Sequence, residues 1–132
     1  IYYYYPGADS DLNYDFLELQ GKATYDFDFA TATLSLNYSP DNFGASDDAF
    51  YPRFTIAAPL PYNLTLNGWV GRQYVSDNAA FALPDYTDWG AGLSYTYETW
   101  SFCATYTGSS IDDDQCPNNC GHRFAFTITK TF

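Results

Sequence analysis

Strict alternation of apolar and polar residues is the feature that most constrains this chain. In the stretch WGAGLSYTY, residues 89–97, apolar side chains occupy every second position, and Gly, Ser and Thr fill the positions between them. WSFCATYT, from residue 100, and RFAFTITKTF, from residue 123, repeat this pattern. A period of two residues is typical of a β-strand with one apolar face, because successive side chains point to opposite faces.

The same pattern predicts an all-β fold, an antiparallel up-and-down meander or β-barrel with about eight strands in this chain. The expected strands cover residues 1–6, 14–27, 30–39, 49–59, 62–75, 88–97, 100–108 and 123–132. Tight turns are expected at Asp28-Phe29, Leu60-Pro61 and Glu98-Thr99, whereas the other connections are long and polar. Short turns at one end and long loops at the other are typical of bacterial outer-membrane barrels. We expect residues 1–132 to form a single β-barrel domain.

The charge and the aromatic content of the chain limit which partners it can have. The chain has 5 Lys and Arg residues against 16 Asp and Glu residues, a net charge of -11. A nucleic-acid partner is therefore not expected, because phosphate binding relies on clustered basic residues. The sequence has no run of about 18 uncharged apolar residues, so a membrane-spanning helix is excluded. With 14 Tyr and 11 Phe residues, the chain nevertheless needs something large to cover its rings.

Aromatic residues on the apolar face are sorted along the strands. Toward the long loops lie Tyr38, Tyr74, Trp89, Tyr106 and Phe124, and toward the tight turns lie Tyr25, Phe27, Tyr62, Tyr97, Trp100 and Phe132. Aliphatic residues, Ala and Gly fill the band between these rows. Two aromatic rows around an aliphatic band are typical of membrane barrels, whose rings sit at the lipid headgroups. The alternation alone fits both a membrane barrel and a soluble β-sandwich. The sorting of the aromatic residues favours the membrane barrel.

Four stretches of the sequence also resemble a known family. They are YYYYPGADSDLNYDFLE, LSLNYSPDNFG, DWGAGLSYTY and the ending C-x-x-RFAFTITKTF. In order and spacing they resemble the TorF-like proteobacterial outer-membrane proteins. The resemblance implies that the chain is the C-terminal portion of a larger barrel of about twelve strands, truncated at its N-terminus. It also implies an outer-membrane location and a porin-like role, and it brings no catalytic residues.

Charged residues on the polar face are the first candidate site. The alternation assigns five charged residues to the polar face, which would face the lumen of a barrel: Glu18, Lys22, Arg53, Glu98 and Arg123. Inside a barrel such charges are expected to pair with one another, because a buried charge needs a partner. We find no convergent group of acids, bases and nucleophiles in the sequence, so the chain is not expected to be an enzyme or to need a cofactor.

Cysteines and acidic loops complete the candidates. The loop CPNNC predicts a disulfide between Cys116 and Cys120, which leaves Cys103 unpaired. Weak calcium candidates are Asp9, Asp11, Asn13 and Asp15 in one loop and Asp112, Asp113 and Asp114 in another. Calcium takes six to eight oxygen ligands, but neither loop has an EF-hand pattern, so solvated acidic loops are the preferred interpretation.

Two functions remain as hypotheses from different classes. The first is an integral outer-membrane β-barrel in contact with outer-membrane lipids, acting as a narrow passive pore or as a structural barrel. The alternative is a self-assembling, filament-like β protein, located outside the cell, that associates through free strand edges.

Overall fold

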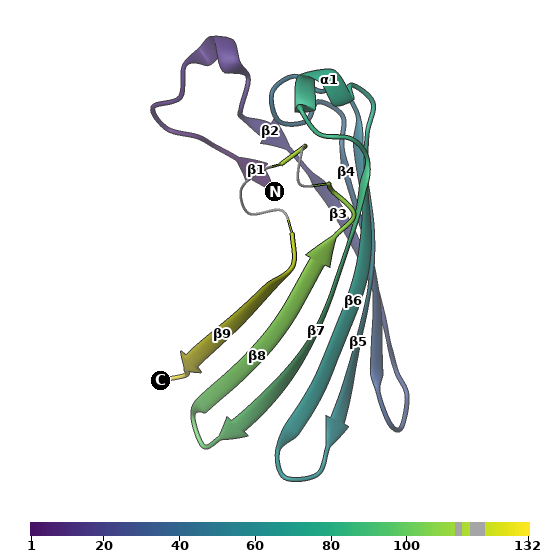
Figure 1. Ribbon diagram of the computed structural model, residues 1–132, viewed down its shortest axis with the longest axis vertical. Helices are drawn as coiled ribbons and strands as arrows, with labels where there is room; N and C mark the ends of the chain where they lie inside the picture. The colour runs from purple at the N-terminus through teal and green to yellow at the C-terminus, as the bar shows by residue number, and fades with distance from the viewer. Residues whose placement is uncertain (113–114, 117–120) are drawn as a thin grey trace.

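One seven-stranded antiparallel sheet dominates the computed structural model, which describes residues 1–112, 115–116 and 121–132 (Figure 1). Its strands neighbour one another in chain order: β3 (Leu19–Asp26), β4 (Thr31–Ser39), β5 (Ala49–Leu60), β6 (Leu64–Val75), β7 (Tyr86–Tyr97), β8 (Trp100–Ser109) and β9 (Arg123–Lys130). A second sheet pairs β1 (Tyr2–Tyr3) with β2 (Phe16–Leu17). The predicted all-β antiparallel meander is confirmed, and β4 to β9 agree with their expected ranges to within two residues at each end.

The N-terminal strand prediction was wrong in detail. The expected strand at 1–6 pairs as β1 only at Tyr2 and Tyr3, and the expected strand at 14–27 is divided into β2 and β3. The amide of Tyr5 donates to the Asp15 carboxylate (2.8 Å) instead of to a neighbouring strand, and the next residue, Pro6, has no N–H to donate. Because neither Tyr5 nor Pro6 offers an N–H to a partner strand, β1 does not extend to these residues.

In the described ranges, two short helices lie in the long loops, where the alternation predicted none. They are η1 (Ser10–Leu12) and α1 (Asn78–Phe81). Asp77 caps α1, because its carboxylate accepts hydrogen bonds from the amides of Ala79 and Ala80 (3.0 Å each). A helix of four residues has too few positions for an apolar period to show in the sequence. None of the helices in the described part of the chain is long and apolar enough to cross a membrane.

Tight turns and long loops segregate to opposite ends of the sheet (Figure 1). The β7–β8 turn is the expected pair Glu98-Thr99, with Glu98 at φ 52°. The β5–β6 turn consists of three residues, 61–63, and not of the expected pair Leu60-Pro61, because Leu60 still belongs to β5 and pairs with Leu64. Tyr62 and Asn63 take φ values of 66° and 60°. Positive φ at both positions matches the twist of a tight hairpin.

The sheet is open in the described structure. Its edge strands are β3 and β9, and these two strands do not pair with each other. Because neighbours alternate in direction along seven strands, the two edge strands run in the same direction. This sheet therefore does not close into a barrel by itself.

Burial is concentrated at the loop end and not in a core beneath the sheet. Among the described residues, the only buried hydrophobic side chains are Ala30, Ala49 and Val75. Of the four buried polar residues, Ser39, Asn42 and Ser46 lie in or beside the β4–β5 loop, and Ser35 lies in the middle of β4. That loop is tied to the segment before α1 by the Asp77 amide, which donates to the Ser46 carbonyl (3.1 Å). The loop end thus holds five of these seven buried residues, whereas Ala30 is buried at the tight-turn end.

Candidate functional site at the polar face and the loop end

The strand register gathers most of the predicted inward charges on one face. We call a row of residues that pair across neighbouring strands a rung. One rung joins Lys22 to Ser35, Arg53, Gly71 and Asp88 across five strands. A rung two residues away, and so on the same face, ends at Arg123. Glu18 lies at the loop end of this face, whereas Glu98 lies in the β7–β8 turn, outside the strands. We call the face that carries Lys22, Arg53 and Arg123 the polar face.

Asp88 is the centre of a hydrogen-bonded cluster on the polar face. The hydroxyl of Tyr51 donates to Asp88 Oδ2 (2.7 Å), and the indole Nε1 of Trp69 donates to Asp88 Oδ1 (3.1 Å). The three residues come from β5, β6 and β7, so the cluster joins three neighbouring strands. Hydrogen bonds to a charged group are stronger than neutral ones, and here both carboxylate oxygens accept one.

Two mid-strand glycines make this cluster sterically allowed. A Cβ built on Gly71 would lie 2.6 Å from Tyr51 Cζ, and a Cβ built on Gly90 would lie 2.8 Å from Trp69 Cε2 and closer still to two other ring carbons. Both distances are well below van der Waals contact. Tyr51 and Trp69 therefore lie across the glycines of the neighbouring strand on their way to Asp88.

The Arg53 guanidinium packs against the Trp69 ring. Its guanidinium carbon lies 4.8 Å from the centroid of the Trp69 ring, a cation–π distance. Its Nε is buried and makes no hydrogen bond within the described structure. The expected pairing of inward charges is thus replaced at this point by stacking, because Tyr51 and Trp69 already bond to the Asp88 carboxylate.

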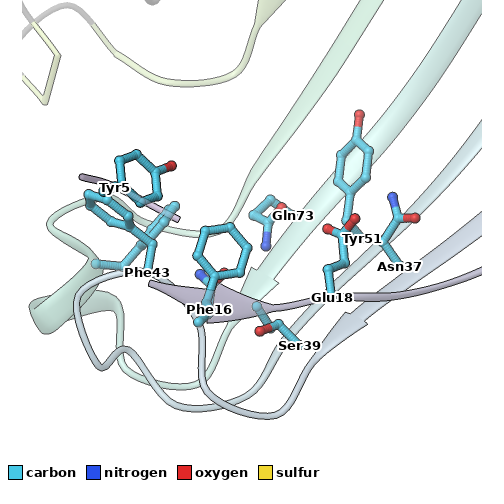
Figure 2. Close-up of a pocket in the computed structure, with 11 residues that line it drawn as sticks. Tyr5, Phe16, Glu18, Asn37, Ser39, Phe43, Tyr51 and Gln73 are labelled. Carbon is cyan, nitrogen blue, oxygen red and sulfur yellow. The ribbon is translucent and has the colours of Figure 1, made fainter. Parts of the chain in front are cut away.

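A pocket of about 210 Å³ lies above this cluster, between the N-terminal segment and the loop end of the sheet (Figure 2). We call it the loop-end pocket. Its lining residues are Tyr5, Phe16, Glu18, Asn37, Ser39, Asn42, Phe43, Ala49, Tyr51, Gln73 and Phe81. Tyr51 belongs to both the pocket and the Asp88 cluster, so the two are contiguous.

The aromatic wall of the pocket depends on contacts between distant segments. Phe43, in the β4–β5 loop, stacks on Tyr14 (centroids 4.3 Å apart) and meets the edge of Tyr5 (5.6 Å). The Gly44 amide donates to the Asn13 carbonyl (2.9 Å) and ties the same two segments together. The alternating pattern gave no signal for these contacts, because Tyr5, Tyr14 and Phe43 lie outside the strands of the structure.

Three calcium candidates of the first loop, Asp9, Asn13 and Asp15, line one pocket, but hydrogen bonds within that loop already engage them. Asp15 accepts hydrogen bonds from the Tyr5 amide and the Tyr2 hydroxyl (3.3 Å), and Asp9 accepts one from the Asp11 amide (3.2 Å). The side chain of Asn13 donates to the Asp11 carbonyl. Within the described ranges, no three His, Cys, Asp or Glu side chains are placed to hold a metal ion. In the second loop, Asp112 is described, and Asp113 and Asp114 lie outside the described residues.

The cysteines are only partly described. Cys103 is free, and its Sγ lies 3.3 Å from Thr105 Oγ1. Cys120 lies outside the described residues, so its disulfide with Cys116 stays a prediction. The only histidine of the sequence, His122, stacks on Tyr106, with centroids 5.6 Å apart.

On the opposite face, apolar rungs slope relative to the sheet ends. One rung joins Tyr25 to Ile56 and continues to Tyr106 and Phe124. Tyr25 is next to last in β3, beside a tight turn, whereas Tyr106 is the seventh residue of β8. Such a stagger between neighbouring strands is the geometry that tilted barrel strands require.

The two cations on this apolar face stand beside rings. The Arg72 guanidinium lies 5.2 Å from the Tyr74 ring centroid, and the Lys130 ammonium lies 5.0 Å from that of Trp100. Arg72 is near the loop end of β6, and Lys130 is the last residue of β9. Long cationic side chains at strand ends can extend along apolar surface and keep their charge in water.

Comparison with known proteins identifies a family and nothing finer. No curated protein and no solved structure matches this chain. One family model matches, that of a bacterial protein of unknown function named Gcw_chp, and it covers residues 1–132. The chain therefore belongs to the Gcw_chp family of bacterial proteins.

Proposed function

We propose that this chain forms the wall of an integral outer-membrane β-barrel whose polar face lines a narrow passive pore. The observation that carries the proposal is the inverted distribution of apolar side chains. Val70, Leu66 and Phe54 are 48%, 49% and 45% exposed in mid-sheet, although a soluble protein of this size would bury such residues in a core. Lipid is the solvent in which that face is stable.

Strand direction supports a larger barrel. Because β3 and β9 run in the same direction, antiparallel closure needs an odd number of further strands between them. A twelve-stranded barrel would need five further strands (12 − 7 = 5), and five is an odd number. The resemblance to TorF-like outer-membrane proteins agrees with this arithmetic and with an outer-membrane location. The proposal assigns no catalytic step and no cofactor to the chain.

The lipid contact is argued from the apolar face. The sloping rungs place aromatic side chains at both ends of that face, where amphipathic rings prefer the headgroup layer. Arg72 and Lys130 extend their charges toward the same two layers. Outer-membrane lipids are therefore the proposed partner of this face.

The test combines folding with conductance. We expect the purified protein to need detergent or lipid for solubility, to migrate differently on gels before and after boiling, and to give small, stable current steps in a planar bilayer. Heat-dependent migration without current would support a structural barrel and refute the pore. A monodisperse protein in water without detergent would refute both.

The open edges support a second candidate, a self-assembling β protein. Each of β3 and β9 has one side without a paired strand in the described structure. Such edges recruit further strands. Regular polymers in water, seen by electron microscopy in the absence of detergent, would favour this extracellular, filament-like function over the barrel.

A further inference from the structure

We propose that the loop-end pocket binds one ring of a neutral saccharide. The inference goes beyond the proposed pore, because binding to this pocket can be measured whether or not the protein conducts. Its basis is the size of the pocket, the separation of rings from polar groups in its lining, and the charge of that lining.

Size limits the ligand to a single ring. The pocket volume of about 210 Å³ is below the roughly 300 to 1,000 Å³ that is usual for sites of drug-sized ligands. The pocket is bounded on one side by the N-terminal segment and on the other by β4, β5 and β6. A longer saccharide could place one ring here and extend toward the Asp88 cluster through the shared residue Tyr51.

The lining has an aromatic side and a polar side. Figure 2 shows the rings of Tyr5, Phe16 and Phe43 gathered together, whereas Gln73, Glu18 and Asn37 lie on the sheet side of the pocket with one further ring, that of Tyr51. A sugar ring has the matching two-sided chemistry, with C–H groups on its faces and hydroxyls around its edge. The faces would pack on the rings, and the hydroxyls would exchange hydrogen bonds with amide and carboxylate groups.

Several polar groups of the pocket are held in place by the protein. Gln20 donates to the Asn37 carbonyl oxygen (2.8 Å), which directs that oxygen to Gln20 and leaves the Asn37 NH₂ group to serve as a donor. Asn42, 9% exposed, donates to the Ser46 hydroxyl (3.2 Å). Fixed polar groups lower the ordering cost of binding a small polar ligand.

Charge selects a neutral ligand. Among the described residues that line the pocket, Glu18 is the one charged residue, and none is Lys, Arg or His. An anionic sugar would lack a cationic partner and would be repelled by Glu18. An organic cation would satisfy Glu18 and the rings, but it would leave the Asn37 NH₂ group and the Gln73 carbonyl oxygen facing apolar groups. A hydroxyl-rich neutral ring satisfies all of these groups.

The test is ligand-observed saturation-transfer NMR on the whole protein. The detergent should be an oligo(ethylene glycol) ether, because sugar or ammonium headgroups would compete for the pocket. The probes are glucose, galactose and xylose as neutral rings, glucose 6-phosphate as an anion and tetramethylammonium as a cation. We expect saturable transfer to at least one neutral sugar and none to the phosphate. Failure of all three sugars to saturate, or tighter binding of tetramethylammonium, would overturn the proposal.

Matched variants locate the binding. Asn37→Leu and Gln73→Leu should each weaken sugar binding at least about threefold, since each removes a hydrogen-bonding group. Asn67→Leu makes the same kind of change outside the pocket and should leave the affinity unchanged. Equal weakening by all three variants would place the sugar elsewhere and refute the site. Heat-dependent gel migration, measured on each variant, reports barrel folding separately.

Discussion

Gly90→Ala is expected to destabilise the folded protein although it adds only one methyl group. At an ordinary strand position, replacing Gly by Ala stabilises by roughly 0.5–1 kcal/mol, because Gly loses more backbone entropy on folding. At Gly90 the new Cβ would overlap the Trp69 indole, which is rigid and lies directly over this glycine. The ring must therefore swing away from β7.

Two interactions are lost when the ring moves. The Trp69 Nε1–Asp88 hydrogen bond, at 3.1 Å, involves a charged acceptor in a partly buried place and is worth about 1.5–3 kcal/mol. The Arg53 stacking on the ring, at 4.8 Å, adds about 0.5–1 kcal/mol. The loss of about 2–4 kcal/mol is partly offset by the backbone-entropy gain of about 0.5–1 kcal/mol, so we expect Gly90→Ala to lower the free energy of unfolding by about 1–3.5 kcal/mol.

The assay is urea-dependent unfolding from lipid vesicles, followed by tryptophan fluorescence. Gly68→Ala is the matched control, because its Cβ would meet only the Gly90 carbonyl oxygen and Ile56 at 3.7 and 3.8 Å, which are ordinary contacts. In a Trp69→Ala background, Gly90→Ala should lose its cost, so the double-mutant cycle isolates the overlap. Equal effects of Gly90→Ala and Gly68→Ala would refute the steric argument.

Three further predictions concern other parts of the chain. Val70→Arg, on the apolar face, should cost about 2–4 kcal/mol in a bilayer, whereas Thr105→Arg on the polar face should cost much less; equal costs in vesicle unfolding would contradict a lipid-facing surface. Asp77→Ala should lower the free energy of unfolding by about 1 kcal/mol through loss of the α1 cap, a change that denaturant titration can detect. Mass spectrometry after alkylation of the unreduced protein should find one reactive thiol, and three would disprove the Cys116–Cys120 bridge.

The strands of the main sheet could be predicted because their signal is local. A period of two residues, with a tight turn such as Glu98-Thr99 between runs, determines both the strand and its orientation. The same pattern correctly separated Arg53 from Phe54, neighbours that the register places on opposite faces.

The cluster and the pocket could not be predicted, because they depend on contacts between distant residues. Tyr51 and Asp88 are 37 positions apart, and their hydrogen bond exists only once the register of β5, β6 and β7 is set. The sequence contained one indirect signal, the glycines at 71 and 90 inside strands, since Gly within a strand often marks a close approach by another group. The contact of Phe43 with Tyr14 joins two irregular loops, for which alternation carries no information.

The way that Tyr51 and Trp69 lie over Gly71 and Gly90 bears on what a pore lined by this face would select. Rings laid along the wall occupy little of the passage, so its width depends on the strands and hardly on these side chains. Their larger effect is electrical, because they supply both hydrogen bonds to the Asp88 carboxylate. Replacing Trp69 by alanine would therefore barely raise the current through a single channel, but it would uncover the Asp88 carboxylate together with the Arg53 guanidinium, so that both charges would act on permeating ions.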